Sequence, residues 1–215
     1  MPKASAEFLG SFFLLNAIVG SGIMATQLTD DVALQLLINA LSTVLMLSVL
    51  ISAFQNVSGA HFNPIVTIYE FIKKDIELKQ FIFFLLAQFS GAIAGTISAN
   101  LMFNSSLSQI SSNDRFNSGS FMGEILATFG LIMVISLKAS KASILVPAWI
   151  GSAYFFTSST SFANPAVTIG RIFTDSFAGI AVSSALPFIA AQLIGLSLLL
   201  LIGNRFIKDR SNERN

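Results

Sequence analysis

Long apolar stretches alternate with short polar segments along most of this 215-residue chain. A helix needs about 20 apolar residues to cross the hydrocarbon core of a bilayer. Six stretches approach or reach that length, at residues 7–26, 32–54, 80–102, 121–138, 142–158 and 184–204. The pattern therefore predicts an all-α membrane protein with six transmembrane helices.

Two shorter apolar segments begin at an Asn-Pro pair and have a helical pattern for about ten residues. They are NPIVTIYEFIKK from Asn63 and NPAVTIGRIFTD from Asn164. Proline suits the first turn of a helix, and asparagine before it suits the N-cap. Ten helical residues rise only about 15 Å, half of the bilayer core. We expect two re-entrant half-helices that end inside the membrane.

The chain contains an internal repeat, which three landmarks mark in the same order. AEFLGSFFLL matches GEILATFGLI and places Glu7 opposite Glu124, the Asn-Pro boxes follow, and AQF at Gln88 matches AQL at Gln192. The repeats cover about 5–103 and about 120–205 within one transmembrane channel domain of residues 1–215. Because each repeat has three spans, an odd number, the second must enter the membrane from the opposite side.

Composition narrows the possible functions. Hydrophobic residues make up 53% of the chain and charged residues 11%, whereas soluble domains carry about 25% charged residues. The net charge of +1 gives no footprint for a nucleic-acid partner. With no cysteine and one histidine, thiolate and multi-histidine metal sites are excluded. We expect no metal, no cofactor and, without a paired nucleophile and base, no enzymatic activity.

Lysine and arginine are unevenly distributed between the two sides of the predicted membrane protein. Arg115 and Arg171 fall outside if the N-terminus is cytoplasmic, and the other ten of the 12 basic residues fall inside. The inside set is Lys3, Lys73, Lys74, Lys79, Lys138, Lys141, Arg205, Lys208, Arg210 and Arg214. This bias predicts a multi-pass protein of the inner (plasma) membrane with both termini in the cytoplasm.

The boxes SGAHFNPIVT and SFANPAVT resemble the two signature loops of the aquaporin superfamily, and the resemblance covers nearly the whole chain. The second box lacks the arginine that usually follows it, as in a bacterial subset of the family. The resemblance implies a homotetramer with one pore per subunit, in which the two asparagines meet at mid-membrane. It implies a pore constriction formed by Asn63, Pro64, Ile65, Asn164, Pro165 and Ala166.

Three further residues are expected to support the pore. In the family, glutamates at the positions of Glu7 and Glu124 accept hydrogen bonds from the re-entrant loops; the alternative is that each is solvated near the interface. His61 lies on the approach to the first box. It is either a hydrogen-bonded structural histidine or a pore-lining residue that contributes gating by pH.

The resemblance also indicates a selectivity filter in which Val167 replaces the usual arginine and Thr43 stands where the family often has an aromatic residue. The TSFAN loop is expected to be one residue shorter than usual, so the next filter position is Ser161 or Phe162. The last falls within residues 151–154, where Ser152 is chosen. We expect Arg171, one turn beyond Val167, to charge the outer vestibule; the alternative is that it partly replaces the absent arginine.

These observations favour a passive channel for water and small uncharged solutes through a wide, arginine-free filter. Glycerol, urea and metalloid hydroxides such as arsenous acid are candidate solutes. The alternative is a secondary transporter of a small solute, because inverted repeats with broken helices also build transporters. Against it, the membrane interior offers no site for a coupled ion beyond Glu7 and Glu124.

Overall fold

The computed structural model describes residues 1–106, 109–137 and 141–212, and all regular structure in these residues is helical. The long helices are α1 (Lys3–Leu28), α2 (Val32–Phe54), α4 (Leu78–Met102), α5 (Ser118–Ser136), α6 (Ala142–Phe156) and α8 (Val182–Asn212). The short ones are α3 (Pro64–Ile72), α7 (Pro165–Gly170) and the 3₁₀ helix η1 (Arg171–Phe173). The fold class predicted from the sequence is confirmed.

Five of the predicted spans are long and apolar enough to cross a membrane, namely α1, α2, α4, α5 and the part of α8 up to Ile202. The remaining span, α6, has 15 residues and contains Pro147. It ends at Phe156, two residues earlier than expected, because the backbone turns extended at Thr157. Lys138 and Arg214, used above to assign the orientation, lie outside the described residues.

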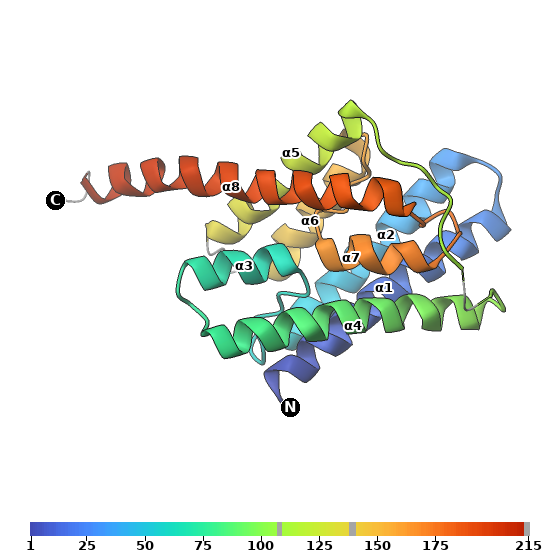
Figure 1. Cartoon of the computed structure of the whole chain (residues 1–215), viewed down its shortest axis with the longest axis horizontal. Helices are drawn as coiled ribbons and strands as arrows, with labels where there is room; N and C mark the ends of the chain where they lie inside the picture. The colour runs from blue at the N-terminus through green and yellow to red at the C-terminus, as the bar shows by residue number, and fades with distance from the viewer. Residues whose placement is uncertain (107–108, 138–140, 213–215) are drawn as a thin grey trace.

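The helices pack in the same order in both halves of the chain. Helix α1 packs against α2 and α4, and α5 packs in the same way against α6 and α8. The half-helices α3 and α7 contact each other at their N-terminal ends and lie between α4 and α8 (Figure 1). The arrangement places the two Asn-Pro boxes at the centre of the bundle.

Small residues allow the closest helix pairs to approach. A Cβ added at Gly91 or Gly95 of α4 would collide with the backbone carbonyls of Phe8 and Phe12 on α1. In the other half, a Cβ at Gly195 of α8 would lie 2.6 Å from the carbonyl oxygen of Ile125 on α5. Glycines that bring backbones together in this way are typical of helix contacts inside membranes.

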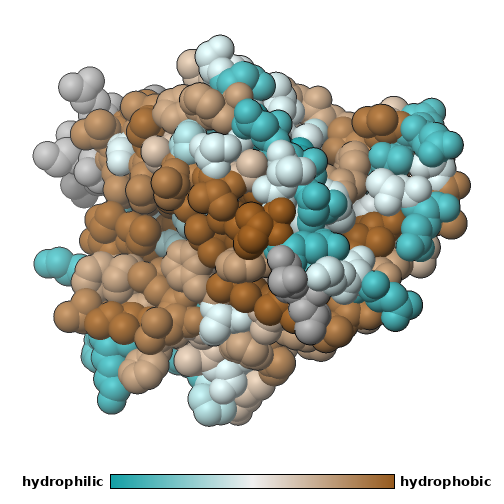
Figure 2. Space-filling model, turned by 45° about the vertical axis from the view of Figure 1, so that its right-hand side comes forward, coloured by the Kyte–Doolittle hydropathy of each residue, from teal (hydrophilic) through white to brown (hydrophobic). Residues whose placement is uncertain are grey.

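Apolar side chains cover much of the outer surface. Figure 2 shows them as a broad brown area, with most of the hydrophilic residues of this view in its right-hand half. Helix α2 alone exposes six large apolar side chains, Val32, Leu34, Leu37, Leu41, Leu45 and Val49. A soluble monomer rarely exposes apolar area on this scale, so the surface is suited to lipid.

We predict opposite effects when alanine replaces two buried glycines. Gly95→Ala should destabilise the protein by about 1 to 3 kcal/mol, because the new methyl group overlaps the α1 backbone. At Gly20 the nearest atom would be 3.6 Å away, so Gly20→Ala should be neutral or stabilising by up to about 1 kcal/mol. Thermal unfolding in detergent measures both, and equal melting temperatures would contradict the packing role of Gly95.

Candidate functional site

The side chains of Asn63 and Asn164 cap the two half-helices. Asn63 Oδ1 accepts a hydrogen bond from Ile65 N at 2.9 Å, and Asn164 Oδ1 accepts from Ala166 N at 2.9 Å. The proline at the first position of each helix has no N–H that would need a partner. Capping occupies the amide oxygens and leaves the two NH₂ groups for other contacts.

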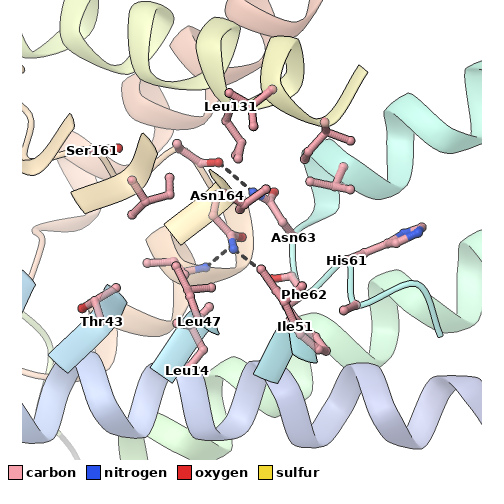
Figure 3. Close-up of a pocket in the computed structure, with 18 of the residues that line it drawn as sticks. Leu14, Thr43, Leu47, Ile51, His61, Phe62, Asn63, Leu131, Ser161 and Asn164 are labelled. Carbon is pink, nitrogen blue, oxygen red and sulfur yellow. Dashed lines mark hydrogen bonds between the residues drawn. The ribbon is translucent and has the colours of Figure 1, made fainter. Parts of the chain in front are cut away.

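Each asparagine amide donates to the carbonyl that immediately precedes the other asparagine (Figure 3). Asn63 Nδ2 donates to Ala163 O at 2.8 Å, and Asn164 Nδ2 donates to Phe62 O at 2.9 Å. The two bonds are equivalent under the inverted repeat. They hold the half-helix N-termini together, and each terminus contributes a partial charge of about +0.5.

The loops before the two boxes share an unusual backbone conformation. Ala60 and Phe62 have φ of 53° and 48°, and Ser161 and Ala163 have φ of 53° and 47°. These are the third and first residues before each asparagine. Non-glycine residues in this left-handed region cost about 1 to 3 kcal/mol each when the surroundings enforce them. The surroundings must therefore supply compensating bonds.

Glu7 supplies these bonds to the first loop. Its Oε1 accepts from Ser58 Oγ at 2.6 Å and from His61 N at 3.0 Å, and its Oε2 accepts from Phe62 N at 2.6 Å. Gln88 of α4 donates to the same Oε2 at 2.8 Å. The carboxylate is fully buried. It is a fixed acceptor for the loop backbone, and the alternative of a solvated interfacial glutamate is wrong.

Glu124 does the same for the second loop. It accepts from Phe162 N at 2.8 Å and from Ala163 N at 2.9 Å, and Gln192 of α8 donates to it at 2.6 Å. This carboxylate is also fully buried. The two glutamates thus occupy equivalent positions and bind equivalent backbone groups.

His61 is both within hydrogen-bonding distance of a neighbouring side chain and part of the cavity wall. Its Nδ1 lies 3.1 Å from Thr67 Oγ1 and its ring packs edge-on against Phe84 at 5.2 Å. It also lines the central cavity. A role in gating is not tested by these contacts.

A cavity of about 330 Å³ runs past the paired asparagines. Figure 3 shows Thr43 and Ser161 on one side of the pair and His61 on the other. The wall is mostly apolar and comes from both halves of the chain, with Leu14, Ile18, Leu47, Ile51, Val66, Leu131, Val146, Ile150 and Val167.

Of the six residues predicted to form the constriction, only Asn63 and Asn164 line the cavity. Pro64, Ile65, Pro165 and Ala166 do not. Ile65 and Ala166 are fully buried in the two hydrophobic clusters behind the wall. The reason is helical geometry, because residues at the start of each half-helix face the neighbouring helices while the capping asparagine faces the cavity.

Four of the predicted filter residues line the cavity, namely Thr43, Ser161, Phe162 and Val167. Ser152 does not, because it lies exposed on the outer side of α6.

Tyr154 takes the place expected for Ser152, with its hydroxyl 3.1 Å from Thr43 Oγ1. Ser152 precedes Tyr154 by two residues, which places it on the opposite side of the helix. The sequence carried a signal for Tyr154 in its helical spacing, since Ala142, Val146, Ile150 and Tyr154 follow each other at intervals of four and all line the cavity.

Arg171 also lines the cavity. The arginine-free filter and the vestibule position of Arg171 stay predictions. Its side chain is 3% exposed. Its Nε donates to Ala178 O, and the guanidinium carbon lies 3.6 Å from the centre of the Phe162 ring. The helix tightens into η1 at this residue, and these two contacts hold the guanidinium in the interior.

Comparison with known proteins gives consistent results. The profile of the major intrinsic protein family (MIP) matches residues 1–162. The aquaglyceroporin AqpS of Rhizobium meliloti is 40% identical over 197 residues, which cover 90% of this chain and 84% of that protein. A probable TIP-type aquaporin of Medicago truncatula is 30% identical over 155 residues, 68% of this chain and 62% of that protein.

Among solved structures, the X-ray structure of the aquaglyceroporin from Plasmodium falciparum superposes with a TM-score of 0.66 at 22% identity. The superposition covers 92% of this chain and 93% of that one. The profile match, the 40% identity and the shared fold agree with the paired Asn-Pro boxes found at the centre of the bundle. The chain belongs to the major intrinsic protein family.

Proposed function

We propose that this protein is a passive channel in which the cavity past Asn63 and Asn164 conducts water and small uncharged solutes such as glycerol, urea or arsenous acid. Family membership supports the coarser statement, a membrane channel for water and small solutes that is not an enzyme. Two relatives described as aquaglyceroporins support the glycerol-sized class. The pathway, its filter and the preferred solute are the proposed parts.

The observation that carries the proposal is the pair of asparagine amides in the wall of an otherwise apolar cavity. Each NH₂ has two N–H groups and donates one to a backbone carbonyl. The other remains for an oxygen atom of a passing solute. The two helix N-termini together resemble about one positive charge. At about 4 Å and an effective dielectric constant near 20, that charge opposes a cation by about 4 kcal/mol, before dehydration is counted. Uncharged solutes meet no such barrier.

The filter that we propose consists of Thr43, Tyr154, Ser161, Phe162 and Val167, with Arg171 beside them. It retains the small residues Thr43, Ser161 and Val167, on which the expectation of a wide opening was based. Arg171 adds a cation beside this proposed filter.

The secondary transporter is less well supported. A coupled ion would need acceptors in the membrane interior, and in the described part of the chain the buried carboxylates are Glu7 and Glu124. The oxygens of both carboxylates already accept hydrogen bonds from the loop backbone and from a glutamine. Binding an ion at either would release a strained loop.

We further propose a homotetramer in the inner (plasma) membrane with both termini cytoplasmic. The distribution of lysine and arginine supports the orientation. The apolar outer faces support burial in lipid or against other subunits. The matching helix order supports repeat boundaries near 5–103 and 120–205.

The direct test is osmotic stopped-flow on liposomes that contain the purified protein. We expect water, glycerol and urea fluxes above those of empty liposomes, proportional to protein density and independent of ion gradients. A pH-sensitive dye in the same liposomes should show no added proton entry. Solute flux that required a sodium or proton gradient would favour the transporter instead.

Replacing Val167 by arginine should narrow the filter. Val167 lines the cavity and is 4% exposed, so a long cationic side chain there must enter the pathway. We expect Val167→Arg to reduce glycerol flux more than water flux, with Val167→Leu as the uncharged control. An unchanged ratio of glycerol to water flux would remove Val167 from the filter.

Glu124→Gln should damage the second loop. A glutamine places an NH₂ donor where two backbone N–H groups need an acceptor, at a cost of about 1 to 3 kcal/mol for a buried unpaired donor. Water flux per folded protein and the melting temperature should both fall. The matched control is Glu77→Gln, because Glu77 is exposed and its side chain forms no cap bond. Equal behaviour of the two variants would contradict the support role of Glu124.

A further inference from the structure

Arg115 lies in the segment that leads into α5 and is not among the described residues that line the cavity. Its guanidinium spans two carbonyls of the loop between η1 and α8. Nε donates to Gly179 O at 2.6 Å, and Nη2 donates to Phe177 O at 2.5 Å. Because the guanidinium is planar and its donors have a fixed spacing, the two carbonyls are held at a set separation.

The loop that Arg115 binds depends on such contacts for its shape. Residues 174–181 contain turns and bends but no regular helix, so no helical ladder fixes the direction of their carbonyls. Ala178 lies between the two carbonyls that Arg115 binds, and its own carbonyl accepts from Arg171 Nε. Among the described residues, the side-chain donors to the carbonyls at 177 and 179 both belong to Arg115. Arg115 thus holds the peptide groups on both sides of the one that binds Arg171.

Phe162 connects Arg115 to the cavity by a second route. Its ring lines the cavity and is 4% exposed. The guanidinium carbon of Arg115 lies over this ring at 5.7 Å from its centre, and that of Arg171 lies at 3.6 Å. A cation over an aromatic face attracts the ring electrostatically. The place of the Phe162 ring in the wall therefore depends on both arginines.

We propose that Arg115 is a positioning residue that sets the solute selectivity of the proposed filter without touching the solute. Its fork holds the carbonyls on either side of Ala178, and its charge attracts the Phe162 ring. Through these contacts it fixes where Phe162 and Arg171 stand in the cavity wall. The selectivity rests on the proposed channel function, whereas the positioning does not.

Selectivity is tested by osmotic stopped-flow on liposomes that contain the wild type or Arg115→Met. Methionine keeps an apolar stem but has neither the fork nor the charge. Without those contacts Phe162 and Arg171 occupy a wider range of positions, so the opening discriminates less by size. We expect the ratio of glycerol to water flux to rise at least about twofold, which corresponds to about 0.4 kcal/mol in the relative barrier. An unchanged ratio would overturn the proposal.

Two further variants separate positioning from a general loosening of the loops. Arg115→Lys keeps the charge but replaces the planar fork by a point donor, so its flux ratio should lie between those of the wild type and Arg115→Met. The matched control is Asn113→Ala, because Asn113 Nδ2 fastens the same two loops by donating to Ser176 O at 2.7 Å. It should lower the melting temperature in detergent and keep the wild-type ratio. An equal rise of the ratio in Asn113→Ala, or a wild-type ratio in Arg115→Lys, would overturn the role of the fork.

Positioning is measured independently of flux by crystal structures of the wild type and Arg115→Met. We expect the Ala178 carbonyl and the Phe162 ring to move or to adopt more than one conformation in the variant. Unchanged positions of both groups would overturn the positioning. Where Arg115→Met does not fold, Arg115→Lys takes its place in both experiments. A wild type without water flux above that of empty liposomes would contradict the proposed channel, while the structures would still decide the role of Arg115.

Discussion

Irregular backbone inside a membrane protein needs an internal partner for every polar group, and two buried carboxylates meet that need here. Glu7 and Glu124 accept from backbone N–H groups in the loops that precede the half-helices. The loops hold left-handed residues that would relax without those bonds. The asparagine-to-carbonyl bonds between the halves depend on the same loops, because Phe62 and Ala163 supply the carbonyls as well as the bound N–H groups. The geometry of the centre therefore follows from the carboxylates.

The carboxylates are in turn positioned by close helix packing. Gln88 of α4 reaches Glu7 of α1, and it also donates to Thr67 Oγ1 of the half-helix at 2.8 Å. Gln192 repeats both contacts with Glu124 and Thr168, the second at 3.1 Å. These bonds require α4 to lie directly against α1, and α8 against α5, which the glycines on α4 and α8 permit. Packing and polar pairing thus reinforce each other in both halves.

The two halves differ where the pathway ends. His61 lines the cavity beside the first box, whereas the second box has Phe162 at the matching place, with the guanidinium groups of Arg115 and Arg171 over its ring. The region beside the second box therefore carries two guanidinium groups, whereas the matching residue beside the first box is a histidine. In the channel that we propose, these loop residues would set solute choice, while the asparagines and glutamates are common to both halves.

The sequence by itself determined the spans, the inverted repeat and the half-helices, because each depends on hydropathy or on motifs repeated at matching places. It also showed that Glu7 and Glu124 occupy equivalent positions in the two repeats. It did not determine which side chains reach the cavity. Ser152 was expected there and Tyr154 is found, because Tyr154 shares the inward face of α6 with Val146 and Ile150, whereas Ser152 lies on the opposite side of the helix. Nor did it show that the side chain of Arg171, expected in the outer vestibule, is buried in the cavity wall, because the contacts that hold it there, with Ala178 and Phe162, come from separate loops. Local pattern fixes the helices, but the direction of a side chain at a loop depends on neighbours that only the tertiary structure brings together.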